Sequence, residues 1–268
     1  MRYHYSLVPG DEPIIKDMPV YDAEGLQNGA LLQLGDTDPD SNADQGISLI
    51  AAYGSAGSSS STCVDCVGIL QDSTYESTTP SNIYATNSNG AKYGKVIINP
   101  FAVYCAEYLQ DTTNDVAVIS SVSTSVTIDN IEDDIDGGWL YFPLTRSGVA
   151  KSLRFITADS NATSTATIDT ALVTAANSTD TIIKILPVHH KLTQLNARST
   201  GKSNSSVGLS SVAFTGASTR LCILENYISS DGHGFEPLRR PSHANLNNLS
   251  NAKFYADIVM LDHLLNQS

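Results

Sequence analysis

The chain is a series of short apolar runs separated by glycine, serine, threonine, asparagine and aspartate. Short runs rich in Val, Ile, Leu and Tyr that are bounded by such residues are typical of β-strands joined by turns. The clearest runs are KVIIN (95–99), FAVYCAEY (101–108), DVAVIS (115–120), TSVTID (124–129), WLYF (139–142), SLRFITA (152–158), TIIKIL (181–186) and RLCILENYI (220–228). Their spacing predicts a sandwich or barrel.

Four segments depart from this pattern. Residues 1–20 contain three prolines, which predicts an extended arm rather than a paired strand. Residues 168–177 could form one short helix, and residues 232–251 are expected to form a long irregular loop, which in compact proteins is usually functional or interfacial. The last apolar segment, 253–265, fits a strand or a helix equally well.

The predicted fold class is therefore all-β, with one or two small β-barrel, β-tulip or sandwich units, an extended N-terminal arm and long loops. We divide the chain into the arm (1–20), a first β-rich domain (21–110) and a second β-rich domain with the long late loop (111–268). A chain of 268 residues buries enough surface to hold a core without a metal or a disulfide.

Charge excludes one class of partner. Acidic residues outnumber basic ones 28 to 15, which gives a formal net charge of −13, and no stretch collects Lys and Arg. Binding to nucleic acid depends on clustered positive charge, so we expect no nucleic-acid partner. We also expect a soluble protein without a membrane partner, because no run of about 18 apolar residues occurs and the N-terminus lacks the apolar segment of a signal peptide.

An acidic stretch, DNIEDDIDGGWLYF (129–142), raises the question of a calcium loop or a carboxylate cluster. Calcium prefers several carboxylate and carbonyl oxygens from one flexible loop, but the stretch lacks the residue order of an EF-hand. Gly137 and Gly138 allow positive φ angles just before an apolar run. We therefore interpret the stretch as an exposed acidic turn that leads into a strand anchored by Trp139 and Tyr141.

Two other patterns are weaker metal candidates. Aspartates alternate in DTDPDSNAD, which would point Asp36, Asp38, Asp40 and Asp44 to one side of an extended chain, although an exposed turn explains them as well. Cys63 and Cys66 have the spacing of a zinc knuckle, but a closed zinc site needs four ligands and no second pair follows. We expect free thiols, no metal and no cofactor.

Catalytic signatures are missing as well. The chain has no G-x-S-x-G motif, and its six histidines fall in segments predicted as arm, strand end or loop. We therefore expect that the protein is not an enzyme.

The order of the apolar runs, from AEGLQNGALLQLGD and GISLIAAYG through CVGILQDSTY, YGKVIINPFAVYCAEY and DNIEDDIDGGWLYF to TIIKILPVHHKL and NAKFYADIVML, resembles the structural proteins of tailed bacteriophages. Among these it is most similar to head decoration, or cement, proteins. The resemblance covers residues 23–261 and is one of pattern and composition. The chain is longer than many small decoration proteins, so the family does not supply a role for its second half.

This resemblance implies a virion protein, made in the host cytoplasm, that sits on the outer capsid surface and cements neighbouring capsid subunits against internal DNA pressure. Its partners would be the major capsid protein and copies of itself in a homotrimer. Aromatic and arginine side chains often dominate interface energy. The contact residues we predict on that basis lie in the arm and in the late loop: Tyr3, Tyr5, Ile14, Ile15, Phe235, Arg239 and Arg240.

Two alternatives share the same β-rich composition. A tail, baseplate or fibre-associated virion protein is the first, although fibres usually show repeats or heptads, and neither is seen in this sequence. A carbohydrate-binding module is the second, because a sandwich that exposes Trp139 and tyrosines could hold a sugar.

Overall fold

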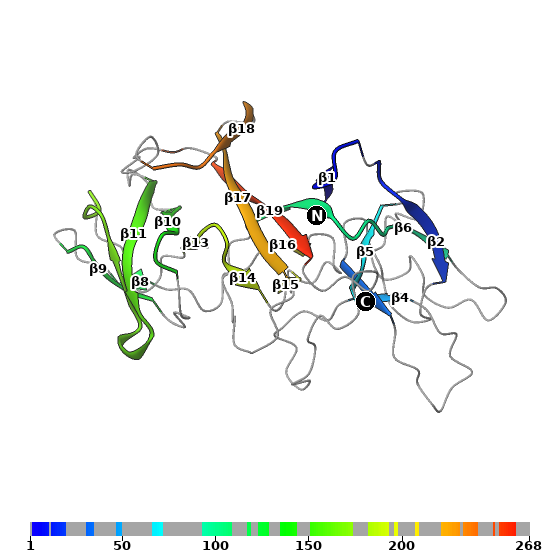
Figure 1. The fold of residues 1–268 in the computed structure, drawn as a ribbon. Coiled ribbons are helices and arrows are strands. Elements are labelled where there is room, and N and C mark those ends of the chain that lie inside the picture. The colour runs from blue at the N-terminus through cyan, green and yellow to red at the C-terminus, as the bar shows by residue number, and fades with distance from the viewer. Residues whose placement is uncertain are drawn as a thin grey trace.

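The computed structural model describes residues 2–10, 12–19, 31–34, 47–49, 66–71, 93–108, 117–118, 123–128, 135–143, 151–173, 182–192, 196–197, 207–208, 221–230, 233–240, 249 and 252–260. Across these residues the chain forms β-strands, one short 3-10 turn at Asn161–Thr163 and no α-helix (Figure 1). The all-β class is confirmed. No helix among the described residues is long and apolar enough to cross a membrane.

Most strands belong to three antiparallel sheets. The central sheet has the order β1 (Arg2–Ser6), β7 (Ala102–Glu107), β19 (Lys253–Met260), β17 (Leu221–Ser230) and β14 (Lys191–Leu192), and β18 (His233–Pro237) also pairs with β17. The distal sheet has the order β13 (Ile183–Ile185), β10 (Trp139–Phe142), β11 (Ser152–Ser160), β12 (Thr165–Ile168), β9 (Ser125–Ile128) and β8 (Ala117–Val118). These two six-stranded sheets curl into half-barrels.

The third, or N-terminal, sheet has the order β2 (Ile15–Pro19), β6 (Tyr93–Ile97), β5 (Cys66–Leu70), β3 (Leu31–Leu34) and β4 (Ile47–Leu49), and a separate ribbon pairs β15 (Asn196–Ala197) with β16 (Val207–Gly208). The distal and N-terminal sheets lie on opposite sides of the central sheet (Figure 1). Because β7 pairs with both β1 and β19, the central sheet joins strands from either side of the boundary predicted at residues 110 and 111.

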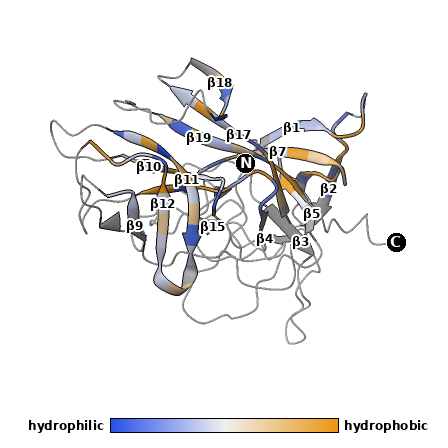
Figure 2. Cartoon of the chain, turned by 60° about the vertical axis from the view of Figure 1, so that its left-hand side comes forward, coloured by the Kyte–Doolittle hydropathy of each residue, from blue (hydrophilic) through white to orange (hydrophobic). Residues whose placement is uncertain are grey.

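The core follows the two-residue period of the strands. Along β19, Phe254, Ala256, Ile258 and Met260 are buried in the main core cluster, whereas Tyr255 and Asp257 lie on the other, outer face. β7 is hydrophobic along most of its length (Figure 2) and is buried at every position except its last. The core cluster draws residues from all three sheets, so they form one continuous interior.

Polar contacts fix the distal sheet against the central one. The buried Asn226 side chain of β17 donates to the Leu186 carbonyl at 2.8 Å and accepts from the Tyr108 hydroxyl at 2.8 Å. Tyr141 of β10 packs its ring 4.9 Å from that of Phe254 of β19. A buried amide whose hydrogen-bonding groups are satisfied in this way favours one relative position of the two sheets.

Burial raises the pKa of Tyr141 from its usual value of 10.0 to about 12, and its hydroxyl donates to the Leu249 carbonyl at 3.2 Å. A tyrosine that holds its proton more tightly when folded stabilises the fold fully below the unfolded pKa and loses that contribution as the pH rises. We therefore expect the free energy of unfolding to fall between pH 10 and 12. The check is absorbance at 295 nm: native protein should ionise later than urea-unfolded protein, and superimposable curves would contradict this.

The acidic stretch before β10 is a tight turn, as predicted, over the part that the structure describes. Ile135 is buried, Asp136 is exposed and Gly137 has a φ of +83°. Trp139 is only 3% exposed and meets the Phe155 ring edge-on at 4.9 Å. It anchors the distal sheet, so the prediction of an exposed Trp139 platform for sugar is wrong. Residues 129–134 lie outside the described residues.

The prediction that the first 20 residues avoid strand pairing is wrong for two segments. β1 pairs with β7 in the central sheet, and β2 pairs with β6 in the N-terminal sheet. Pro9 and Pro13 lie in the connection between β1 and β2, where no ladder bond is lost. The buried Asn99 side chain holds that connection by donating to the Glu12 carbonyl at 2.9 Å and accepting from the Ile14 N–H.

The predicted helix over residues 168–177 is wrong where the structure describes it. Ile168 ends β12, and residues 169–173 continue without helix. The buried Arg154 side chain explains this, because its guanidinium donates to the Thr170 carbonyl at 3.1 Å and to the Ala171 carbonyl at 3.4 Å. Carbonyls bound to a side chain from β11 do not need the hydrogen bonds of a helix.

Two further expectations are resolved near the C-terminus. The segment predicted as an irregular loop begins as β18, which pairs antiparallel with β17 in a hairpin. The last apolar segment is the strand β19 over Lys253–Met260, so the helix alternative is wrong there. Its core residues Phe254, Ala256, Ile258 and Met260 recur at the two-residue period of a strand.

Candidate functional site

Four aromatic side chains lie on the outer face of the central sheet, and we call them the aromatic face: Tyr5, Tyr227, Phe235 and Tyr255. Tyr227 and Tyr255 are direct cross-strand partners on β17 and β19. Phe235 of β18 meets the Tyr255 ring at 4.7 Å and the Tyr227 ring at 6.3 Å, both edge-on. Such pairs stabilise a sheet face and hold the rings in fixed positions.

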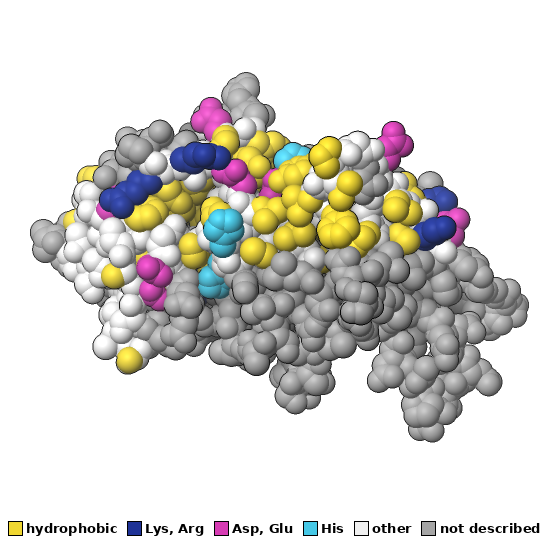
Figure 3. All heavy atoms as spheres, viewed as in Figure 1, with side chains coloured by type: hydrophobic (Ala, Val, Ile, Leu, Met, Phe, Trp, Pro, Cys, Tyr) yellow, Lys and Arg dark blue, Asp and Glu magenta, His cyan; other side chains and the backbone are white. Residues whose placement is uncertain are grey.

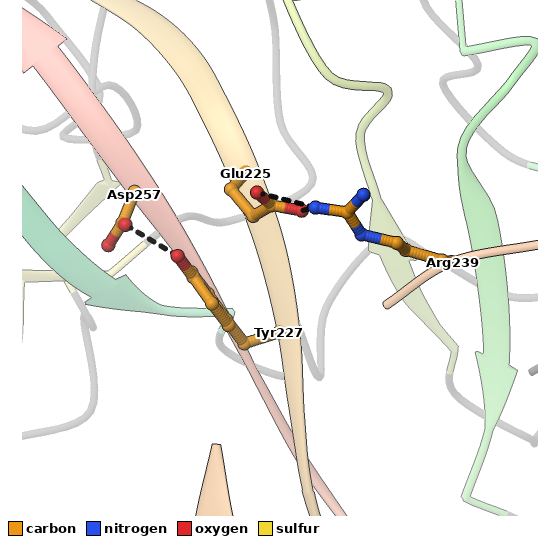
Figure 4. A network of polar contacts seen from close by, with 4 residues as sticks. All are labelled: Glu225, Tyr227, Arg239 and Asp257. Atoms are coloured by element: carbon orange, nitrogen blue, oxygen red, sulfur yellow. Dashed lines mark hydrogen bonds and ion pairs between the residues drawn. The ribbon is translucent and has the colours of Figure 1, made fainter. Parts of the chain in front are cut away.

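A fully buried carboxylate, Asp257, lies beneath this face. The Tyr227 hydroxyl donates to one of its oxygens at 2.8 Å (Figure 4), and His4 Nδ1 lies 2.8 Å from the other. The His4 ring also meets the rings of Tyr5 at 5.1 Å and Tyr227 at 6.3 Å. Asp257 therefore ties the N-terminal strand β1 to β17 and β19.

An irregularity in β1 makes this possible. The pairing register of β1 with β7 shifts between Tyr3 and Tyr5, which is the effect of a bulge. Tyr3 packs against the core, with its ring 6.5 Å from that of Tyr104. His4 and Tyr5 instead extend over the outer face, where His4 meets Asp257.

Two arginines at the rim of the face make contacts within the chain. Arg239 Nη2 donates to both carboxylate oxygens of Glu225, at 2.8 and 3.0 Å (Figure 4). The next residue, Arg240, places its guanidinium carbon 4.4 Å from the centre of the Phe155 ring on β11. The two arginines predicted as partner contacts thus have contacts within their own chain, one with the central sheet and one with the distal sheet.

Two carboxylates, Asp257 and Glu225, raise the pKa of tyrosines on the aromatic face. Burial raises the pKa of Tyr227 well above its usual range, and its hydrogen bond to Asp257 and the charges of Asp257 and Glu225 raise it further. Burial also raises the pKa of Tyr5, and the charges of the same two carboxylates act in the same direction. Two phenols from different strands are therefore influenced by the same two carboxylates.

Exposed apolar side chains continue from the aromatic face along the N-terminal edge of the molecule. We call the following set the apolar rim: Leu7, Val8, Ile14, Ile15 and Phe101. Each is between 43% and 48% exposed. The Leu7 N–H donates to the Phe101 carbonyl at 2.9 Å, so these two residues are neighbours. Figure 3 shows hydrophobic side chains gathered over the region of β1 and the connection that follows it.

The predicted contact residues divide into three groups. Tyr5, Ile14, Ile15 and Phe235 are exposed. Tyr3 is half-buried against the core. Arg239 and Arg240 are exposed but in contact with Glu225 and Phe155.

The metal candidates receive no support from the described part of the chain. Asp36, Asp38, Asp40, Asp44 and Cys63 lie outside the described residues. Across the described ranges no group of three or more metal-ligating side chains occurs. Cys105 and Cys222 are thiols, as predicted.

Sequence reasoning missed Asp257, Tyr227 and Tyr255. One signal could have found the carboxylate: it is the only charged residue in the apolar run FYADIVM. A charge within such a run is costly to bury unless it has hydrogen-bonding partners, so it indicates a partnered acid. The side chains that contact Asp257, those of Tyr227 and His4, could not be found in this way, because they lie 30 and 253 residues away in the sequence.

Comparisons with known proteins found no match to this chain among protein-family models, curated proteins or solved structures.

Proposed function

We propose that this protein is a structural virion protein that binds the outer surface of a phage capsid and cements neighbouring capsid subunits. The observation that carries the proposal is the apolar rim together with Tyr5 and Phe235, all between 39% and 48% exposed. Exposed apolar side chains gathered on one side of a protein mark a site of interaction with another molecule. From the resemblance of the sequence to phage decoration proteins, we infer that the partner is the major capsid protein.

The proposed mechanism needs no chemical step. A copy that contacts two capsid subunits must be released from both before they separate, and effective concentration makes two modest contacts hard to break. A homotrimer would multiply the effect, and closed cyclic oligomers are the common form of homo-oligomers. The net charge of −13 supports an external position, because packaged DNA would repel an acidic protein placed inside the shell.

The sharpest test is a paired substitution in the apolar rim. Leu7→Asp combined with Ile14→Asp should weaken attachment to decoration-free heads by at least about tenfold, since each buried aliphatic side chain contributes about 1 kcal/mol and each aspartate must be desolvated. The melting temperature should change little, because both side chains are more than 40% exposed. Co-sedimentation with heads measures attachment.

The matched control is Val173→Asp, which changes an exposed valine, 67% exposed, that follows β12 of the distal sheet. It should attach like the unmodified protein. Equal attachment by the double variant would contradict the proposal. Deletion of residues 1–20 is a poorer test, because it would remove β1 and β2 from their sheets.

A second measurement separates the capsid from the tail. Purified particles would be resolved on a density gradient, and mass spectrometry would give the copy number of this chain relative to the major capsid protein. Hundreds of copies on DNA-filled heads are expected. A few copies that leave with the tails would favour a tail, baseplate or fibre-associated protein instead.

A further inference from the structure

The aromatic face combines two features that recognise the same kind of group. Phe235 and Tyr5 are 44% and 39% exposed, so a partner can reach their rings. Aromatic rings carry partial negative charge on their faces and attract cations, arginine most often. We propose that this face receives an arginine side chain of the partner protein. The inference depends on the proposed function in one respect, that this surface binds protein, and it specifies the chemistry of what is bound.

Charge is the second feature. Asp257 accepts a hydrogen bond from Tyr227 beneath the face, and Glu225 lies at its rim, where Arg239 contacts it. Both carboxylates raise the pKa of Tyr5 and Tyr227. A guanidinium placed over the rings would therefore contact the rings directly and be attracted by the carboxylates at longer range, since Asp257 is fully buried and Glu225 already contacts Arg239. An anionic group would be repelled by the same carboxylates, which makes a phosphate or an acidic side chain an unsuitable occupant.

The rings are also held in place before any partner arrives. Phe235 is fixed edge-on to Tyr255 and Tyr227, and the Tyr227 hydroxyl is fixed by Asp257. A preorganised site loses little side-chain freedom on binding. The chain already contains one example of the proposed contact, because Arg240 lies 4.4 Å from the centre of the Phe155 ring.

Arginine fits this face better than lysine for a geometric reason. Its planar guanidinium stacks on rings and still directs N–H groups sideways to carboxylates, whereas the ammonium of lysine is a compact, strongly hydrated charge. The contact between Arg239 and Glu225 at the rim shows a guanidinium that uses both oxygens of a carboxylate.

The test uses the full-length protein and two immobilised peptides, Gly-Arg-Gly-Arg-Gly and the same peptide with citrulline in place of arginine. Citrulline keeps the shape of the side chain and removes its charge. Biolayer interferometry should show at least about fivefold tighter binding to the arginine peptide, which is the range of a cation–aromatic contact. Because the chain is acidic overall, its net charge alone could favour the arginine peptide. Substitutions that leave the net charge unchanged therefore test whether the aromatic rings contribute.

Phe235→Ala should lower affinity for the arginine peptide about fivefold, and Phe235→Tyr should restore it. Val173→Ala is the control and should have no effect. The proposal is overturned if Phe235→Ala binds the arginine peptide as tightly as the unmodified protein, or if the two peptides bind equally. Equal binding of the peptides would point instead to a neutral ligand. Heads are not used, so failure of this test is distinguishable from failure of capsid attachment.

Discussion

Replacing Gly68 with alanine should strongly destabilise the protein, because the added methyl group has no space. A Cβ at this position would lie 1.8 Å from the carbonyl oxygen of Ile97 and 3.2 Å from a methyl group of Val96. Both belong to β6, next to Gly68 on β5, so the two strands would have to separate. The φ of +146° adds strain for any residue other than glycine.

Overpacking of this kind costs about 3 kcal/mol or more of unfolding free energy when the neighbour is backbone and cannot rotate away. Urea denaturation followed by the fluorescence of Trp139, the only tryptophan, measures the loss. Gly10→Ala is the matched control: Gly10 also has a positive φ, +79°, but an added Cβ would meet nothing within 4 Å. It should cost about 1 kcal/mol from the backbone strain alone. Similar losses for the two variants would contradict the argument.

Replacing Asp257 with alanine is the second change for which we expect a large effect. The substitution removes a fully buried carboxylate that contacts both His4 and Tyr227. Hydrogen bonds to a charged group contribute more than neutral ones, so the loss should be about 2 kcal/mol. The β1 strand should also exchange its backbone amide hydrogens faster, because its side-chain link to β19 is gone.

The control for Asp257→Ala is Asp17→Ala. Asp17 forms an ion pair with Lys95 at 2.9 Å, but both side chains are more than half exposed. Exposed ion pairs contribute little, so this loss should stay below about 0.5 kcal/mol. Urea denaturation and hydrogen exchange measured on both variants check the contrast. Equal effects would mean that burial of Asp257 does not increase the contribution of its contacts.

The sequence predicted most of the strand framework, and the reason is local. Runs such as WLYF, SLRFITA and RLCILENYI coincide with β10, β11 and β17, because apolar β-formers bounded by turn residues carry their signal within a few positions. The turn before Trp139 was found for the same reason. Its two glycines are next to each other in the chain and needed no knowledge of distant residues.

The wrong predictions concern segments whose structure depends on residues far away in the sequence. β1 and β2 are strands because β7 and β6 present pairing edges, and β7 lies about 100 residues after β1 in the chain. Residues 169–173 avoid helix because Arg154, on another strand, binds their carbonyls. In the candidate site, Tyr5 and Phe235 were predicted as surface aromatics. Asp257, which lies beneath them, was missed because its partners are assembled only by the sheet.

The position of β7 between β1 and β19 has a consequence for how the protein is made. A ribosome releases β1 first, β7 about 100 residues later, and β19 about 150 residues after β7. Pairings between such distant segments form slowly, because the intervening chain must be ordered first. Until then β7, which is hydrophobic along most of its length, lacks the neighbour on one side that completes its ladder. The nascent chain therefore carries an open apolar strand until β19 emerges, and segments about 250 residues apart in sequence must come together before β7 is protected from aggregation.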